Sequence, residues 1–172
     1  MTTQPAQRAP SIGPKEIANG GVLNGKNLAH FEDDGANVIG GVYTDDNSGK
    51  GNSIVIWCLK PGQENSTQWH ENITHVFIIN EGEGVYMKGE PFMAPVECPQ
   101  ATAPTPAPGF KPTLIPIKAG DIICIPEKTV HGIRNTGKVN LSYTAFSLGG
   151  PYGRIDVGPQ VPSHRRPGAP AH

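Results

Sequence analysis

Short stretches rich in valine, isoleucine, tyrosine and phenylalanine recur along the chain, and glycine, proline, asparagine or aspartate bounds each one. Such stretches are too short for helices and predict β-strands. Strands are expected at Asn37–Tyr43, Ser53–Leu59, His75–Ile79, Gly84–Lys88, Leu114–Ile117, Asp121–Ile125 and Asn140–Leu148. A short helix is expected only within Pro14–Phe31. Many short strands joined by Gly/Pro turns predict an all-β sandwich or barrel.

Chain length and the distribution of glycine and proline predict the domain organisation. A chain of 172 residues is long enough for one domain with a real core and too short for two comfortable ones. The two ends are rich in Pro and Gly without periodicity, which is typical of extended arms. We therefore predict an N-terminal arm at 1–36, a barrel at 37–149 and a Pro/Gly-rich tail at 150–172. The proline-rich segment Pro91–Pro116 is expected to be a long loop.

Charge and hydropathy restrict the class of partner. The net charge is −1 and no basic run is present, so neither nucleic acid nor an anionic membrane surface is an expected partner. No apolar run approaches the roughly 18 residues that span a bilayer. The three cysteines form no CxxC pair, and the N-terminus has no apolar signal region. A small molecule is the expected partner, and a cytoplasmic location is the default expectation.

The segment "QWHENITH" contains His70 and His75 close to Gln68. On a helix these histidines would lie about 140° apart around the axis, and the zinc-protease pattern needs them one residue closer. On a strand Gln68 and His70 share a face, whereas His75 faces the other way unless a turn intervenes. Residues 71–74 can form that turn, after which the three side chains would converge. The segment by itself leaves a metal site and surface polarity both open.

Two spaced motifs give the chain a resemblance to a known superfamily. The first is Gly62-x5-Gln68-x-His70-x4-His75-x6-Gly82, and the second is Gly120-x5-Pro126-x-Lys128-x2-His131-x3-Asn135. Together they resemble the cupin motifs G-x5-H-x-H-x3-4-E-x6-G and G-x5-P-x-G-x2-H-x3-N, over a region from Gly62 to Gly137. The resemblance implies a double-stranded β-helix barrel of the jelly-roll type, one divalent metal inside it, and a homodimer.

The chain departs from the cupin pattern at three positions. Gln68 stands where the family has its first histidine, His75 stands where it has a glutamate, and Lys128 replaces a turn glycine. Carried over by position, the resemblance implies His70, His75 and His131 as metal ligands, with Gln68 as a weak fourth ligand or a hydrogen-bonding neighbour. Gln68 and His75 are the candidate catalytic residues. Fe(II) is favoured by the resemblance, and Mn, Zn or Ni remain open because imidazole suits several of these ions.

Strand alternation also predicts part of the substrate pocket. Phe77 and Ile79 share the parity of His75, and Ile133 shares the parity of His131, so all three are expected to face inward. Alternation leaves open the facing of four further candidates for the pocket wall, Tyr86, Cys124, Tyr143 and Phe146. The tryptophans Trp57 and Trp69 are expected in the core.

The chemistry of the implied site favours an anionic substrate. Three neutral imidazoles leave the ion's 2+ charge uncompensated, which favours a bidentate enolate, β-diketonate or phenolate oxygen ligand. The missing glutamate removes the obvious general base. Glu71 is expected to point away from the ligands and Glu81 to lie in the turn after the strand.

Three functions are consistent with such a site. Three-histidine sites in the superfamily resemble those of mononuclear non-haem iron dioxygenases, so the first expectation is a dioxygenase acting on an enolisable or phenolic substrate that chelates the metal. The alternative is a nonredox metal-dependent lyase, isomerase or cyclase. A second alternative is a small-molecule-binding cupin without catalysis.

Overall fold

The computed structural model describes residues 21–44, 52–65, 67–91, 112–150 and 155–156. Most of the loop predicted at Pro91–Pro116 lies outside these ranges, as do most of the N-terminal arm and of the C-terminal tail. In the described part of the chain no helix is long and apolar enough to cross a membrane.

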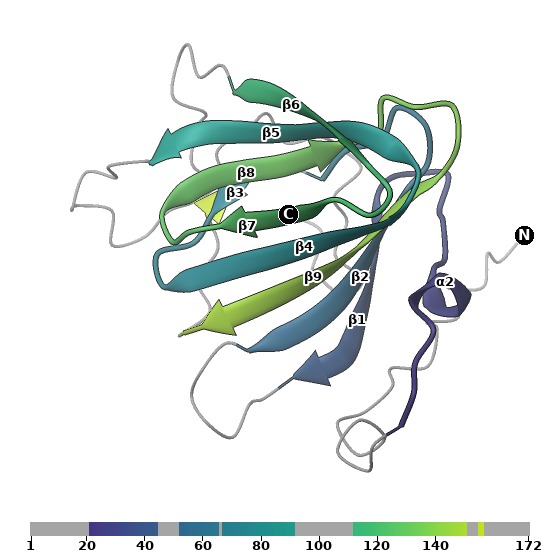
Figure 1. The fold of residues 1–172 in the computed structure, drawn as a ribbon, viewed down its shortest axis with the longest axis horizontal. Helices are drawn as coiled ribbons and strands as arrows, with labels where there is room; N and C mark the ends of the chain where they lie inside the picture. The colour runs from purple at the N-terminus through teal and green to yellow at the C-terminus, as the bar shows by residue number, and fades with distance from the viewer. Residues whose placement is uncertain (1–20, 45–51, 66, 92–111, 151–154, 157–172) are drawn as a thin grey trace, which may run out of the picture.

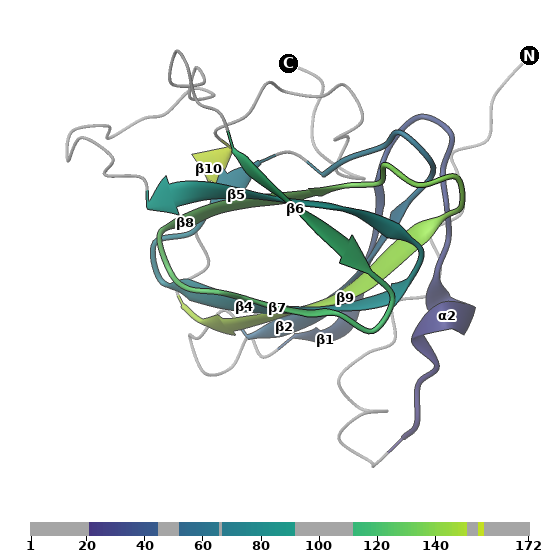
Figure 2. The same ribbon diagram turned by 45° about the horizontal axis from the view of Figure 1, so that its top comes forward.

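Two five-stranded antiparallel sheets face each other and enclose the core (Figures 1 and 2). The first sheet contains, in spatial order, β1 (Asn37–Thr44), β2 (Ser53–Leu59), β9 (Leu141–Gly149), β4 (Ile73–Glu81) and β7 (Ile122–Ile125). The second contains β10 (Ile155–Asp156), β3 (Gln68–Trp69), β8 (Thr129–Arg134), β5 (Glu83–Pro91) and β6 (Thr113–Lys118). The predicted all-β double-stranded β-helix is confirmed.

Every strand expected from the sequence is present, with ends that differ by a few residues, and three further strands were missed. β8 was missed because five of its six residues are buried, so it lacks the polar–apolar alternation that marks a half-exposed strand. β3 and β10 have two residues each and pair with one another. Strands of two residues depend on pairing with neighbouring strands, and they are too short to show an alternation of polar and apolar residues. β10 falls in the segment predicted as the tail.

The described residues of the predicted N-terminal arm lie against the first sheet. The helix α2 (Gly25–Leu28) falls within the expected Pro14–Phe31, and the Asn24 side chain accepts a hydrogen bond from the Lys26 backbone N–H. Three apolar side chains of this segment pack on a cluster that includes Ile56 and Cys58, namely Leu23, Leu28 and Phe31. Burial in this cluster raises the pKa of the Cys58 thiol to about 11.

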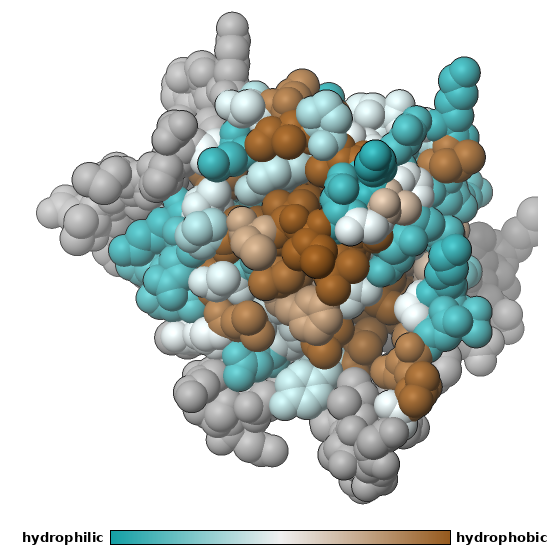
Figure 3. Space-filling model, in the orientation of Figure 1, coloured by the Kyte–Doolittle hydropathy of each residue, from teal (hydrophilic) through white to brown (hydrophobic). Residues whose placement is uncertain are grey.

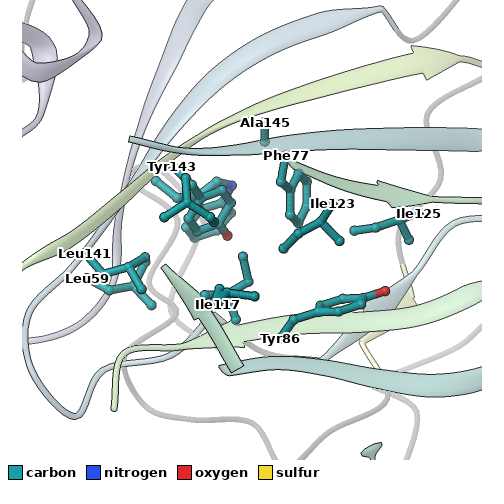
Figure 4. Close-up of a cluster of buried hydrophobic side chains, with 12 residues drawn as sticks. Leu59, Phe77, Tyr86, Ile117, Ile123, Ile125, Leu141, Tyr143 and Ala145 are labelled. Carbon is teal, nitrogen blue, oxygen red and sulfur yellow. The ribbon is translucent and has the colours of Figure 1, made fainter. Parts of the chain in front are cut away.

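The core lies between the sheets and is built from the inward set of each strand. Figure 4 shows side chains of both sheets meeting in the interior, with Leu59 and Leu141 at one end and Ile125 at the other. Leu59 and Leu141 are cross-strand partners and are fully buried, so apolar side chains close that end. The planes of Trp57 and Tyr143 stack with ring centroids 6.3 Å apart, and both tryptophans are buried as expected.

Buried asparagines join the loops to the strands. The Asn65 amide donates to the Tyr143 hydroxyl at 2.6 Å and accepts from the Ile133 backbone N–H. Asn135, the last residue of the second motif, donates to the carbonyls of Leu59 and Val139 at 2.9 and 2.8 Å. An unsatisfied buried backbone group costs about 1–3 kcal/mol. By pairing such groups, these two asparagine side chains stabilise the fold.

The outer face of the first sheet corrects two predictions about the pocket. Cys124 of β7 and Phe146 of β9 are both cross-strand partners of Val76, so the three side chains share one face. Val76 alternates with the buried His75 and Phe77, and that shared face is therefore the outside. Cys124 is exposed. Neither Cys124 nor Phe146 lines the interior.

An apolar patch covers part of this outer face, as the brown area of Figure 3 shows. Ile122 and Leu148 contribute to it, with 65% and 47% of their surfaces exposed. Apolar side chains on both faces of β7 and β9 explain why alternation did not settle the facing of Cys124 and Phe146. The homodimer implied by the resemblance stays a prediction.

Candidate metal centre

Three histidines from separate parts of the chain meet at the end of the barrel opposite the leucines. His70 follows β3, His75 belongs to β4, and His131 belongs to β8. Their ring centroids are 4.6 Å apart for His70 and His75, 5.0 Å for His75 and His131, and 5.6 Å for His70 and His131. Each side chain offers a nitrogen within 4.8 Å of the other two, and all three are buried. The grouping of the three histidines that the resemblance implied is confirmed.

Local backbone structure explains how these side chains are brought together. A bend at Glu71 and Asn72 reverses the chain after His70, and β4 begins at Ile73, so the turn is shorter than predicted. Glu71 is exposed, as expected. The backbone N–H of Lys128 donates to the His70 carbonyl at 2.8 Å, and Lys128 adopts a left-handed φ of 61°. The residue that replaces the motif glycine thus keeps the glycine-like conformation and ties the two motifs together.

Hydrogen bonds orient two of the three imidazoles. His131 Nδ1 lies 2.8 Å from the Thr129 carbonyl oxygen, and because a carbonyl can only accept, Nδ1 carries the proton. The lone pair of His131 is therefore on Nε2, the nitrogen that can bind a metal. His75 Nδ1 lies 3.2 Å from Ser147 Oγ, and since a hydroxyl can donate or accept, this contact orients the ring without fixing its tautomer. Sequence reasoning missed Ser147, although a serine at an inward position of an otherwise apolar strand is a usable signal.

Replacing Ser147 with alanine is expected to weaken metal binding by about 10–100-fold, the usual effect of removing a group that orients a ligand imidazole. The His75 ring would stay in the barrel interior but lose the hydrogen-bonding partner that orients it. Competition with a chromophoric chelator measures the change in Kd directly.

Ser142→Ala is the matched control. Ser142 is another buried serine of β9, and its hydroxyl donates to Glu81 at 2.9 Å, away from the histidines. Its loss should leave the metal Kd unchanged. Equal Kd values for the Ser147 variant and the wild type would show that Ser147 does not orient His75.

The donor set fits a divalent transition metal. With metal–nitrogen bonds of about 2.0–2.1 Å, two imidazoles on one tetrahedral ion have nitrogens roughly 3.4 Å apart. Nitrogens already within 4.8 Å reach that spacing by small side-chain rotations. Neutral imidazole is a ligand for Fe, Zn, Cu and Ni alike, so His70, His75 and His131 would hold the ion without deciding its identity.

Gln68 faces the same interior space. It is the cross-strand partner of His131, so both side chains leave the sheet on one face, and only 4% of Gln68 is exposed. Its Oε1 atom is buried and makes no hydrogen bond with the described residues. A buried amide oxygen of this kind can ligate a metal or accept a hydrogen bond from a bound molecule. Its role as a fourth ligand stays a prediction.

The side chains packed beside the histidines are apolar and aromatic. The Phe77 ring lies 5.5 Å from the ring of His75 and 5.8 Å from that of His131. Ile133 and Tyr86 are cross-strand partners in the interior core, so the structure settles the facing of Tyr86 as inward. Burial raises the pKa of Tyr86 to about 12, which keeps its phenol protonated at neutral pH.

Two other predicted wall residues lie deeper in the barrel. Ile79 and Tyr143 are cross-strand partners in the interior core, as expected for Ile79. The Tyr143 hydroxyl accepts a hydrogen bond from the Asn65 amide, so this polar group already takes part in a bond that stabilises the fold. Both residues form the floor of the interior between the histidine end and the leucine end.

The buried side chains that the structure describes include no aspartate and no glutamate. Glu81 is the last residue of β4 and accepts a hydrogen bond from Ser142, which corrects its predicted place in the following turn. The described side chains at the histidine end of the barrel therefore supply ligands and proton donors, and none of them is an acidic general base.

Solved structures share this architecture at low sequence identity. A Klebsiella pneumoniae protein with a double-stranded β-helix domain matches 80% of this chain and 97% of its own, at 18% identity and a TM-score of 0.60. An oxalate oxidase matches 79% of this chain and 63% of its own, at 17% identity and a TM-score of 0.56. Peruvianin-I, a cysteine peptidase from Thevetia peruviana latex, matches 80% and 77% at 20% identity and a TM-score of 0.55. No protein-family model matches the sequence, and neither does any curated protein sequence.

These likenesses establish the architecture and leave the reaction open. An oxidase and a peptidase share it, which illustrates that function depends on the site carried by a fold. The three buried histidines are the feature of this chain from which its chemistry can be argued.

Proposed function

The chain has the double-stranded β-helix fold of the cupin superfamily, and on that premise we propose that it is a mononuclear non-haem iron dioxygenase. Its substrate would be an enolisable or phenolic small molecule that chelates the metal. One observation carries the proposal: His70, His75 and His131 offer three buried nitrogens to one ion, with His75 in place of the motif glutamate. Such a ligand set is neutral and leaves the full ionic charge to be balanced by an anionic substrate.

When bound, a ferrous ion supplies Lewis acidity and redox reactivity toward O2. The chain's own residues supply the environment. Phe77 and Ile133 exclude water from the space beside the histidines, which strengthens electrostatic attraction to an anionic oxygen. The protonated Tyr86 phenol can donate a hydrogen bond to a substrate oxygen, and Gln68 can orient a second one. Inserting both oxygen atoms into the substrate consumes no external reductant.

A substrate that loses a proton readily suits the described side chains best. Among the residues whose burial the structure describes, no acidic residue is buried where it could serve as general base. We infer that the substrate owes its anionic form to its own acidity, as β-diketones and catechols bound to a cation do. This requirement disfavours a lyase or isomerase mechanism that needs a protein base at an unactivated carbon.

Metal content and oxygen uptake test the proposal together. Protein purified without chelator is expected to carry about one iron per chain, and an oxygen electrode should record uptake with a β-diketone or a catechol. One O2 consumed per substrate, with both atoms recovered in products by 18O labelling, is the expected stoichiometry. Zinc or manganese with no uptake would select the nonredox enzyme, and a chain that holds no metal would select the small-molecule-binding cupin.

A further inference from the structure

A lysine side chain starts from the same inner surface as the histidines. Lys88 of β5 lies directly across from His131 of β8. Cross-strand partners project to the same face, with Cβ atoms about 4.5–5.5 Å apart. Tyr86, two residues earlier on β5, has the same parity and packs in the interior core. Lys88 is thus an inward-facing cation next to the metal centre, and sequence reasoning did not identify it.

Exposure changes sharply along the inner face of β5. Tyr86 is 5% exposed, whereas Lys88 and its partner on β6, Thr113, are exposed. The boundary between the buried interior and the surface therefore lies at Lys88. Its strand lies about 4.8 Å from the strand that carries His131, the ordinary spacing of neighbours in a sheet. A molecule of modest size bound at the histidines can reach both.

Lys88 and Tyr86 are both hydrogen-bond donors. Within the described ranges, no carboxylate lies within salt-bridge distance of the Lys88 ammonium, and the Tyr86 hydroxyl makes no hydrogen bond with the protein. Figure 4 shows that hydroxyl directed toward Ile125, which is the cross-strand partner of His75. Two donors at the histidine end call for an anionic oxygen acceptor from outside the chain.

We propose that Lys88 and Tyr86 form a second anchoring site, which binds a carboxylate at the end of the substrate remote from its metal-chelating group. This inference rests on the proposed function and narrows its substrate to acids. One carboxylate oxygen accepts a hydrogen bond from the Lys88 ammonium, and the other accepts one from the Tyr86 hydroxyl. The apolar wall at Phe77 and Ile133 then accommodates the hydrocarbon or aromatic skeleton between the two polar ends.

Two catechols that differ by one carboxylate distinguish binding at the metal from binding at Lys88 and Tyr86. The full chain is loaded with Zn²⁺, which does not oxidise catechols, and titrated calorimetrically with catechol and with 3,4-dihydroxybenzoate. Both chelate through two hydroxyls, and only the second carries a distal carboxylate. Wild type should bind the carboxylated probe about tenfold more tightly, the order expected of one charge-assisted contact at a partly exposed site.

Three variants assign that preference to residues. Lys88→Met keeps the stem and removes the charge, so the preference should fall at least fivefold while catechol affinity stays the same. Lys88→Arg should retain the preference, and Tyr86→Phe should lower it by about two- to fivefold. Lys118→Met is the matched control. Lys118 is an exposed lysine of the neighbouring β6, and it faces outward because its neighbour Ile117 is part of the interior core.

A metal-free titration makes the inference independent of the ion. Benzoate should bind the apoprotein weakly and lose that binding in Lys88→Met. If neither catechol binds the zinc-loaded chain while benzoate still depends on Lys88, the proposed chelation fails and the anchor stands. If both catechols bind wild type equally, or the preference survives Lys88→Met, the anchor is overturned and the chelating site is untouched.

Discussion

Replacing His131 with alanine is expected to lower the metal content of protein purified without chelator from about one ion per chain to less than a tenth of that. Protein metal sites of several ligands bind with about 10–16 kcal/mol, so one ligand accounts for roughly 3–4 kcal/mol, or a factor of several hundred in Kd. His131 is 1% exposed and its Nε2 is held ready by the bond from Nδ1 to Thr129. Elemental analysis by mass spectrometry measures the outcome, and oxygen uptake should disappear with the metal.

His30→Ala is the matched control for this experiment. His30 is exposed and contacts Glu32 at 2.8 Å, outside the barrel, so its loss should leave the metal content unchanged. Losing the His131 imidazole also deprives the Thr129 carbonyl of a donor at a cost of about 1–3 kcal/mol, so circular dichroism must show that the variant is folded. A folded variant with full metal content would remove His131 from the ligand set.

Gly82→Ala is expected to lower the free energy of unfolding by about 2–5 kcal/mol. Gly82 has a φ of 79°, and a Cβ at this position would lie 2.4 Å from the Asn140 carbonyl oxygen and 2.8 Å from the Leu141 Cα. Left-handed strain costs roughly 1–2 kcal/mol, and forcing an extra methyl into a packed backbone contact adds about 1–3. Urea unfolding monitored by circular dichroism should show the loss, and thermal unfolding should show a fall in Tm of roughly 4–20 °C.

Gly62→Ala separates the two contributions. Gly62 has a similar φ of 84°, yet a Cβ there would meet no atom within 4 Å. This variant should lose only about 1–2 kcal/mol, the cost of the left-handed conformation. Similar losses for the two variants would mean that the backbone near Asn140 moves away, and that steric contact does not explain the first-motif glycine at 82.

Strand alternation and turn residues predicted the barrel because most strands have one apolar and one mixed face. β4 shows this best, with His75, Phe77 and Ile79 buried and the residues between them partly exposed. β8 escaped because its two faces are both buried, and a strand without contrast between its faces has no period-two signal. The two-residue strands β3 and β10 exist only through their pairing.

The resemblance to the cupin motifs predicted the ligand set, and it did not predict the surroundings of the ligands. Ser147 reaches His75 and Thr129 reaches His131 through tertiary contacts or local backbone geometry that no motif records. The local sequence does not distinguish Lys88 from a lysine on the outer face of a strand. Its place across from His131 depends on the pairing of two strands that are far apart in the chain.

By itself the sequence determined which side chains could share a strand face, which residue types could bind a metal, and where the chain turns. These properties follow from local geometry, since alternation and backbone conformation act over a few residues. Only the tertiary structure decided which face of β7 and β9 is inside, and therefore that Cys124 and Phe146 lie on the outer surface. Both faces of these strands carry apolar residues, so the choice depends on register with β4, a set of long-range hydrogen bonds that local pattern cannot specify.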